Sequence, residues 1–278
     1  MTSPLYSPEA LRTSLGSVRL LDARPSGSAY AALHLAGAIH ADLGKALSSA
    51  EAPGADPARG GRHPLPAPDV FAAQLVAWGI TPETTVVLYD DQNGANAAAR
   101  GWWMLRSLGH RKAYVLDGGL PAAIAAGAPT SQDVQSAVPS AALYPHRGWQ
   151  LPRVDIEEVA KRATSPDWKV LDVRSRERYR GDSEPLDPVA GHIPGAVNLP
   201  YASNLDAAGR FRSPTELRAQ YTELLGGTSP AHLVVHCGSG VTACHTLVAL
   251  EIAGLSGAAL YVGSWSEWCR SGREQSRG

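Results

Sequence analysis

The chain has 278 residues, of which 18% are charged, and its formal net charge at pH 7 is -1. This length suits one large or two ordinary domains, and the near-neutral charge does not favour nucleic acid or an anionic membrane surface as a partner. The three cysteines have no paired spacing, which argues against disulfides, and no metal-ligand spacing is found. The sequence also shows no apolar run long enough to span a membrane and no signal-peptide pattern. These observations predict a cytoplasmic protein without disulfides, metal or membrane contact.

Short apolar segments alternate with helical ones along the first half. The pattern predicts a strand at Thr85–Tyr89, a helix at Ala95–Leu108 and a strand at Ala113–Leu116. This alternation is typical of an α/β domain built on a mainly parallel sheet flanked by helices. The loop at residues 50–68 is too long for a simple connection, and loops of that length often carry function.

Four segments of the first half recur in the second half in the same order, at offsets of 145 to 158 residues. The pairs are Leu20–Arg24 with Val170–Arg174, His34–Ile39 with His192–Val197, Val86–Asp90 with Leu233–Cys237, and Val115–Gly119 with Leu260–Ser264. A repeat this long indicates a duplicated domain rather than a solenoid. We expect an N-terminal domain at residues 1–126, a Pro/Ser/Ala-rich linker at 127–148 and a C-terminal domain at 149–278.

The segment Val234–His245 carries the strongest functional signal. An apolar run ends at Cys237, a Gly/Ser loop follows, and a helix is predicted from Thr242 to Leu250. This order places Cys237 at the carboxyl edge of a parallel sheet, where glycines and a helix N-terminus can form an anion-binding nest. A thiolate nucleophile is therefore predicted. Cys244 and Cys269 lack this setting and are expected to be buried structural thiols.

The first half carries Asp90 at the position that matches Cys237. A carboxylate cannot take the covalent role of a thiolate towards sulfur. The N-terminal domain is therefore expected to be a catalytically silent copy that packs against the active one and lends residues to it.

Together these features resemble the tandem-domain rhodanese family of thiosulfate and 3-mercaptopyruvate sulfurtransferases, over nearly the whole length of the chain. The segments that carry the resemblance are Trp102-Trp103, Leu116–Gly119, Leu171–Arg174, Arg178–Gly181, Gly191–Ala196, the Cys237 loop and Gly263–Trp268. The resemblance implies two rhodanese-like domains and a double-displacement reaction. In that reaction Cys237 takes a sulfur atom as a persulfide and passes it on, without an organic cofactor.

The loop Cys237-Gly238-Ser239-Gly240-Val241-Thr242 resembles the mercaptopyruvate type, whereas the thiosulfate type usually carries basic side chains at the positions of Gly238 and Ser239. The resemblance assigns catalysis to Cys237, Ser239 and His63. Substrate binding falls to Arg178, Arg174 and the backbone of the cysteine loop, namely Gly238, Gly240, Val241 and Thr242. A guanidinium fork suits a carboxylate, and Ser239 can polarise a carbonyl or relay a proton. The structural alternative for Arg174 is an ion pair.

Two positions depart from the mercaptopyruvate pattern. Nine residues after Arg178, where that type has a second arginine, this chain has Asp187. Gly44 stands where the acidic member of the relay is expected, with Asp42 two residues before it. Arg174, Arg176 and Arg180 are the nearby candidates to replace the missing charge.

The spacing Ser264-x-x-Glu267 is typical of a capping box and predicts a helix start there. Trp265 is then either part of the core or a residue lining the mouth of the site.

We expect an enzyme that moves sulfur from 3-mercaptopyruvate to cyanide or to a thiol, such as a small thiol or a thioredoxin-like protein. The alternatives are a thiosulfate:cyanide sulfurtransferase on the same cysteine, or a persulfide carrier or sensor that does not turn over. A cysteine-dependent phosphatase is disfavoured, because that class needs an arginine six residues after the cysteine and this chain has Ala243 there.

Overall fold

The computed structural model describes residues 3–278, and the chain divides into two compact units. The first unit comprises residues 3–49, Pro66–Gln150 and Ala207–Arg210, and the second comprises Ala50–Leu65, Leu151–Asp206 and Phe211–Gly278. The long loop that carries His63 thus belongs to the second unit, together with Cys237. Residues 127–148, expected to be a linker, lie in the first unit.

The first unit is built on a five-stranded sheet in the order β1-β6-β5-β2-β4, with every pair parallel. Its strands are β1 (Leu5–Tyr6), β2 (Arg19–Asp22), β4 (Ile39–His40), β5 (Val86–Tyr89) and β6 (Ala113–Leu116). A separate antiparallel pair joins β3 (His34–Leu35) to β7 (Thr130–Ser131). The central strand β5 is buried along its whole length, as expected for a parallel sheet covered on both faces.

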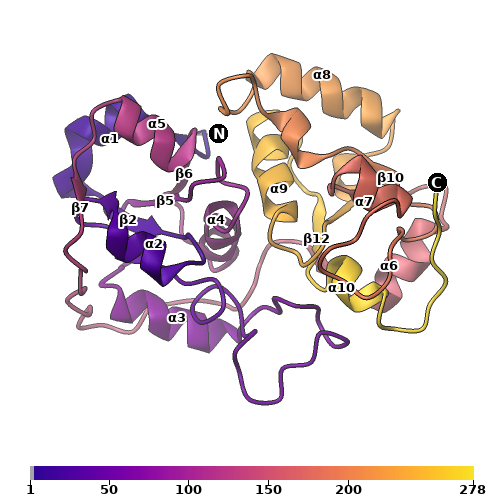
Figure 1. The fold of residues 1–278 in the computed structure, drawn as a ribbon, viewed down its shortest axis with the longest axis horizontal. Helices are drawn as coiled ribbons and strands as arrows, with labels where there is room; N and C mark the ends of the chain where they lie inside the picture. The colour runs from indigo at the N-terminus through magenta and orange to yellow at the C-terminus, as the bar shows by residue number, and fades with distance from the viewer. Residues whose placement is uncertain (1–2) are drawn as a thin grey trace. The chain divides into compact units, whose positions relative to one another are not determined.

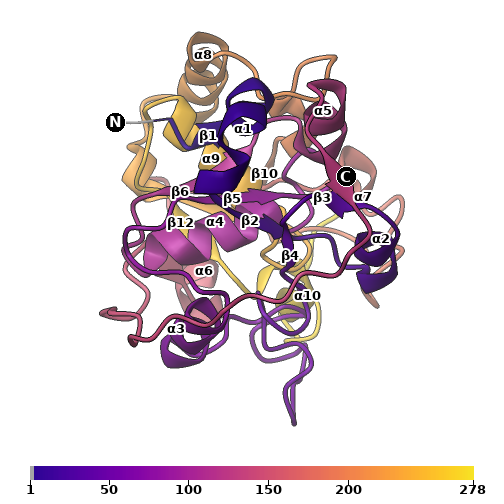
Figure 2. The same ribbon diagram turned by 90° about the vertical axis from the view of Figure 1, so that its left-hand side faces the viewer.

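Helices cover both faces of this sheet. They are α1 (Pro8–Ser14), α2 (Gly27–Ala32), α3 (Pro68–Ala77), α4 (Ala98–Ser107) and α5 (Gly119–Ala125), with a 3-10 turn at Leu15–Ser17. Helices α1 and α5 lie together on one face, and α3 and α4 lie on the other (Figure 2).

The second unit repeats this arrangement. Its parallel sheet has the order β10-β9-β11-β12-β8, which is the order of the first sheet read from its other edge. The strands are β8 (Arg153–Val154), β9 (Lys169–Asp172), β10 (Val197–Asn198), β11 (Leu233–His236) and β12 (Ala259–Tyr261). The helices are α6 (Ile156–Ala163), α7 (Arg176–Arg180), α8 (Pro214–Leu225), α9 (Ala243–Ile252) and α10 (Ser264–Trp268), with 3-10 turns at Tyr201–Asn204 and Pro230–His232. Helices α8 and α9 lie together on one face, and α6 and α10 on the other (Figure 1).

The predicted α/β fold and the internal repeat are confirmed down to side-chain contacts. In the first unit, Arg24 donates hydrogen bonds to Asp22 through Nε and Nη2. In the second unit, Arg174 donates to Asp172 through the same two nitrogens. In both units the Nη2 to Oδ2 distance is 2.6 Å. A duplicated sequence has therefore kept a duplicated ion pair beneath the end of the sheet.

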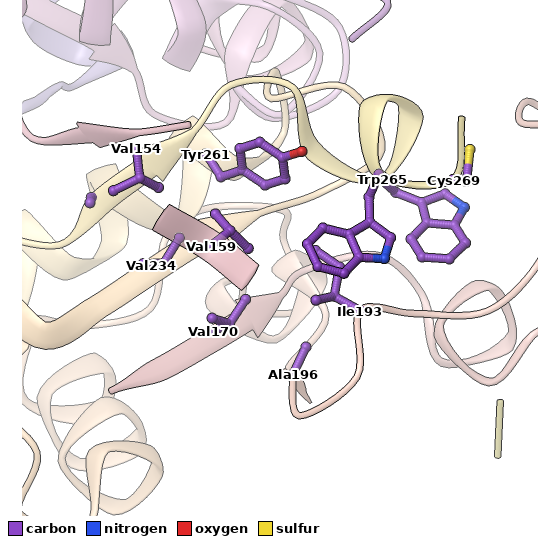
Figure 3. Close-up of a cluster of buried hydrophobic side chains, with 11 residues drawn as sticks. Val154, Val159, Val170, Ile193, Ala196, Val234, Tyr261, Trp265 and Cys269 are labelled. Atoms are coloured by element: carbon purple, nitrogen blue, oxygen red, sulfur yellow. The ribbon is translucent and has the colours of Figure 1, made fainter. Parts of the chain in front are cut away.

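The core of the second unit gathers beneath α10 (Figure 3). Trp265 of α10 has no exposed surface and belongs to the same buried cluster as Ile193, Val159 of α6 and Val170 of β9. Its indole N–H donates to the carbonyl of Val189 at 2.9 Å. The Trp265 side chain is thus part of the core, and it fixes α10 on the sheet through buried apolar area.

The turn after β5 is filled by a side chain of its own. The buried carboxylate of Asp90 accepts five backbone N–H bonds of 2.8 to 3.1 Å. The donors are Gln92, Gly94, Asn96, Ala97 and Ala98. These bonds explain why α4 begins at Ala98 and not at Ala95 as predicted, because the preceding N–H groups turn inward to the carboxylate.

Replacing Asp90 is therefore expected to destabilise the first unit. Asp90→Ala leaves five backbone N–H groups, three of them buried, without their acceptor, which we expect to lower the free energy of unfolding by about 3 kcal/mol. Hydrogen exchange in Val86–Tyr89 under increasing urea measures this change. The matched control is Asp91→Ala, which removes an exposed carboxylate next in the chain and should change stability by less than about 0.5 kcal/mol. Equal stability of the two variants would contradict the role given to Asp90.

Candidate active site

Cys237 lies directly after β11, at the carboxyl end of the central strand of the second sheet. Its side chain is almost fully buried, with 3% of the residue exposed. Its N–H donates to Ser264 Oγ at 3.2 Å, and its carbonyl accepts the Trp265 N–H at 3.0 Å. Two residues of α10 therefore hold the backbone of the cysteine in place.

The loop after Cys237 has four N–H groups that meet no acceptor among the described residues. Within residues 3–278, the N–H groups of Gly238, Ser239, Val241 and Thr242 make no hydrogen bond. Gly240 has φ +73°, and a Cβ on it would lie 2.3 Å from the Val262 carbonyl oxygen, so only glycine fits this turn. The matching loop of the first unit is closed by the Asp90 carboxylate. Among the described residues, no side-chain acceptor closes the loop after Cys237 in this way.

Ser239 and His63 are brought together as the sequence predicted. Ser239 Oγ lies 2.9 Å from His63 Nδ1, and 7% of Ser239 is exposed. The two residues are 176 positions apart in the chain and meet because the loop Ala50–Leu65 belongs to the second unit. A hydroxyl paired with an imidazole can pass a proton or polarise a nearby oxygen.

Helix α10 anchors the loop that carries His63. Glu267 Oε1 accepts the Gly60 N–H at 2.7 Å, and Ser266 Oγ accepts the Arg62 N–H at 3.0 Å. Gly61 approaches so closely that a Cβ on it would lie 2.3 Å from the Gly263 carbonyl oxygen. The backbone N–H groups of Gly60 and Arg62 are thus both bonded to α10, and this holds in place the segment that leads into His63.

The predicted capping box at Ser264 is wrong. Ser264 is the first residue of α10 with φ +55°, and its hydroxyl donates to the Tyr261 carbonyl instead of capping the helix. Glu267 is occupied by Gly60 and by the Tyr261 hydroxyl. Ser264 instead accepts the Cys237 N–H, and Glu267 accepts the Gly60 N–H of the long loop. Both side chains therefore hold backbone near Cys237 and His63.

Arg174 is saturated by protein acceptors. It bonds Asp172 through Nε and Nη2, Glu184 through Nη1 and the Gly191 carbonyl through Nη2, and its guanidinium stacks on Trp265 at 4.7 Å. Only 3% of Arg174 is exposed. This arrangement matches the structural alternative stated for Arg174, an ion pair under the site.

Asp172 is ionised by its neighbours. Burial alone would raise the pKa of its carboxyl, but the charges of His236 and Arg174 outweigh burial and lower that pKa. Burial in turn lowers the pKa of His236, and the Asp172 carboxylate opposes that shift. The guanidinium of Arg174, whose pKa is raised, despite burial, by Asp172 and Glu184, is the lasting positive partner of Asp172.

Arg178, on α7, keeps part of its guanidinium free. Its Nε and Nη2 bond the carboxylate of Glu184, at 3.2 and 2.6 Å. Its Nη1 makes no hydrogen bond within the described residues and lies 3.4 Å from where a Cβ of Gly238 would stand. The predicted anion-binding arginine therefore faces the cysteine loop.

Sequence reasoning missed three charged residues here, namely Arg62, Glu184 and Arg270, which gather around Asp187 and Arg178. The carboxylate of Asp187 forms ion pairs with both Arg62 and Arg270, the latter at 2.8 Å. Arg62, adjacent to His63, also reaches the Gly238 position, at 3.3 Å from Nη2. Glu184 bridges Arg174 and Arg178. For these residues the sequence offered one clue, which is that Arg62 lies next to His63, a residue already assigned to the site. Arg176 and Arg180 pair with none of these acids.

Comparisons with known proteins agree with this geometry. A family profile described as "Rhodanese-like domain" matches residues 7–126 and 155–271. The chain belongs to the rhodanese family. Similar proteins include a Pseudomonas aeruginosa protein named "Probable 3-mercaptopyruvate sulfurtransferase", 43% identical over 274 residues that cover 93% of this chain and 92% of that one. They also include the chicken thiosulfate sulfurtransferase, 34% identical over 73% of this chain and 70% of that one.

Among solved structures, the 3-mercaptopyruvate sulfurtransferase from Leishmania major superimposes with a TM-score of 0.82 at 33% identity. The match covers 96% of this chain and 74% of that one. This rhodanese therefore has the tandem-domain α/β fold that its sequence predicted, and it is a sulfurtransferase. The relatives differ in the donor that their names give, so the family alone does not choose between donors.

The other thiols of this rhodanese are structural in their surroundings. Cys244 has no exposed surface and its Sγ donates to the Gly240 carbonyl, and burial raises the pKa of Cys269. Among the described residues, no helix has the length and apolar character needed to cross a bilayer.

The anchoring by α10 gives a prediction for the long loop. Ser266→Ala removes the acceptor of the Arg62 N–H, so we expect amide exchange at Arg62 to rise by at least about tenfold, measured in peptides that span residues 58–65. Ser271→Ala is the matched control, because it removes an exposed serine hydroxyl just beyond the same helix. Unchanged exchange in Ser266→Ala would show that the loop is held in some other way.

Proposed function

We propose that this rhodanese transfers the sulfur of 3-mercaptopyruvate to cyanide or a thiol through a persulfide on Cys237. The observation that carries the proposal is the Ser239–His63 contact at 2.9 Å beside an open cup of backbone N–H groups. A carbonyl-bearing donor develops an enolate oxygen as its carbon–sulfur bond breaks. A polarising hydroxyl is useful for that donor and has no counterpart task with thiosulfate.

In the first half-reaction the Cys237 thiolate attacks the sulfur of the donor. A sulfur–sulfur bond forms, the carbon–sulfur bond breaks, and its electron pair leaves with carbon as the enolate of pyruvate. The proton of the donor thiol ends on that carbon, so the products are pyruvate and the Cys237 persulfide anion. Two-step covalent transfer of this kind needs no organic cofactor.

Ser239 and His63 stabilise the negative charge that develops on the carbonyl oxygen of the donor in this step. The Ser239 hydroxyl donates to the carbonyl oxygen as it becomes an enolate, and His63 takes up or returns the proton of that hydroxyl. The N–H groups of Gly238, Ser239, Val241 and Thr242, together with that of Gly240, stabilise the anionic sulfur. Arg178 holds the donor carboxylate through its free Nη1. Arg174 supports the site by fixing Asp172 and Glu184.

In the second half-reaction the acceptor attacks the outer sulfur of the persulfide. Cyanide leaves as thiocyanate, and a small thiol or a thioredoxin-like protein leaves as a persulfide, each time restoring the Cys237 thiolate. The N-terminal domain takes no part in bond making, because Asp90 occupies the equivalent cup. We place this activity in the cytoplasm, where thiols are reduced.

Thiosulfate is the second candidate donor. The observation that favours it is the pair of guanidinium groups, from Arg62 and Arg178, that face Gly238. A sulfonate-bearing dianion would bind such a pair well.

Loss of the nucleophile is expected to abolish the reaction. Cys237→Ser keeps the size of the side chain but supplies no thiolate, so kcat/KM should fall by at least about 10³-fold. A coupled pyruvate assay measures this, with circular dichroism to check folding. Cys244→Ser is the control, since a hydroxyl there can still donate to the Gly240 carbonyl. Turnover retained by Cys237→Ser would contradict the mechanism.

The donor is decided by direct comparison. With cyanide as acceptor, we expect kcat/KM for 3-mercaptopyruvate to exceed that for thiosulfate by at least about tenfold, since only the former uses the Ser239 hydroxyl. Ser239→Ala should lower kcat with 3-mercaptopyruvate and leave thiosulfate turnover nearly unchanged. A preference of the wild-type protein for thiosulfate would establish the second candidate instead. Single sulfur loading without turnover would indicate a carrier.

A further inference from the structure

Three guanidinium groups converge on one buried carboxylate beside the cysteine loop. The side chain of Asp187 is fully buried, and it pairs with Arg62, with Arg270 at 2.8 Å and with Arg178 at 3.7 Å. The three arginines come from different segments. Arg62 lies in the long loop, Arg270 lies two residues after the end of α10, and Arg178 lies on α7. Asp187 is thus the shared counter-ion of the whole group.

Two of these arginines keep a free nitrogen that points at the same place. A Cβ on Gly238 would lie 3.3 Å from Arg62 Nη2 and 3.4 Å from Arg178 Nη1. Neither nitrogen makes a hydrogen bond in the part of the chain that the structure describes. Because Gly238 follows Cys237 directly, both free donors face the residue next to the proposed nucleophile.

The charges of the surrounding cluster nearly cancel. Four guanidiniums, from Arg62, Arg174, Arg178 and Arg270, face three carboxylates, from Asp172, Glu184 and Asp187. Four positive and three negative charges leave one positive charge. With a second arginine in place of Asp187 the surplus would be three, so the aspartate decides how much negative charge the site can neutralise.

We propose that Arg62 and Arg178 together bind the anionic group of the sulfur donor, and that Asp187 restricts the site to donors with one negative charge. This inference rests on the proposed function, in which 3-mercaptopyruvate is the monoanionic donor. Arg62 thereby replaces the arginine that is missing at position 187, and it does so from a distant segment of the sequence. Asp187 acts on specificity through its charge, without touching the donor.

The physical basis is that Coulomb energy scales with the charge of the ligand. Removing the negative charge of Asp187 strengthens the binding of a dianion about twice as much, in free energy, as that of a monoanion. Asp187→Asn is a clean way to do this. Its amide oxygen can keep the contacts that Oδ1 makes with Arg62 and Arg270. Its NH₂ replaces Oδ2, which accepts no hydrogen bond within the described residues and lies 3.7 Å from Arg178 Nη2.

The test measures anion binding at Cys237 without any turnover. Alkylation of Cys237 by iodoacetamide, followed by peptide mass spectrometry, is slowed by bound anions and yields the dissociation constants of pyruvate, a monoanion, and sulfate, a dianion. Asp187→Asn should shift the ratio of these constants towards sulfate by at least about tenfold. Arg62→Gln should shift it towards pyruvate, and the double variant should return it close to the wild-type value.

The matched controls are Asp182→Asn and Arg59→Gln, which change the same charges at exposed positions of the same two segments. Both should leave the ratio unchanged. If Asp187→Asn weakens or strengthens both anions equally, Asp187 is a structural residue only and the inference is wrong. Steady-state assays of the same variants with 3-mercaptopyruvate and thiosulfate separate the two proposals. Absence of wild-type turnover would refute the proposed function, while the alkylation ratios still decide the inference.

Discussion

A strand-to-helix turn at the edge of a parallel sheet leaves inward-pointing N–H groups that need an acceptor, and both halves of this chain are organised around that need. In the first unit the acceptor is built in, because Asp90 receives five N–H bonds. In the second unit Cys237 takes the equivalent position, and the N–H groups of Gly238, Ser239, Val241 and Thr242 make no hydrogen bond within the described residues, so we propose that the donor supplies their acceptor. The two turns differ at this central position, where the first has a carboxylate that accepts the N–H groups and the second has a thiol.

The second constraint is the cost of burying charge near Cys237. Under the proposed function, guanidinium groups there hold an anionic donor, but unpaired buried charges are strongly destabilising. The chain meets both demands by pairing each arginine with a buried carboxylate, Asp172, Glu184 or Asp187, and leaving single nitrogens of Arg62 and Arg178 free. The same carboxylates that make the cluster stable thus define its charge towards the donor.

Much of this was accessible from the sequence, because local patterns carried it. The repeated segments located the strands on either side of the site, and the run from Val234 to Thr242 located the strand end at Cys237 and the loop that follows it. The Ser239–His63 pair followed from resemblance to a family and not from spacing. Arg62, Glu184 and Arg270 could not be found in this way, since they meet only through the folding of segments that are far apart. Ser264 was misread because its positive φ turns its hydroxyl towards Cys237.

The central claim is that Cys237 carries the transferred sulfur. The most direct measurement is the mass of the protein, and of its Cys237 peptide, after incubation with 3-mercaptopyruvate and no acceptor. The account predicts a gain of one sulfur atom, located on Cys237 and lost again when cyanide is added. A sulfur atom on Cys244 or Cys269 instead, or no gain in mass while pyruvate is still released, would contradict it.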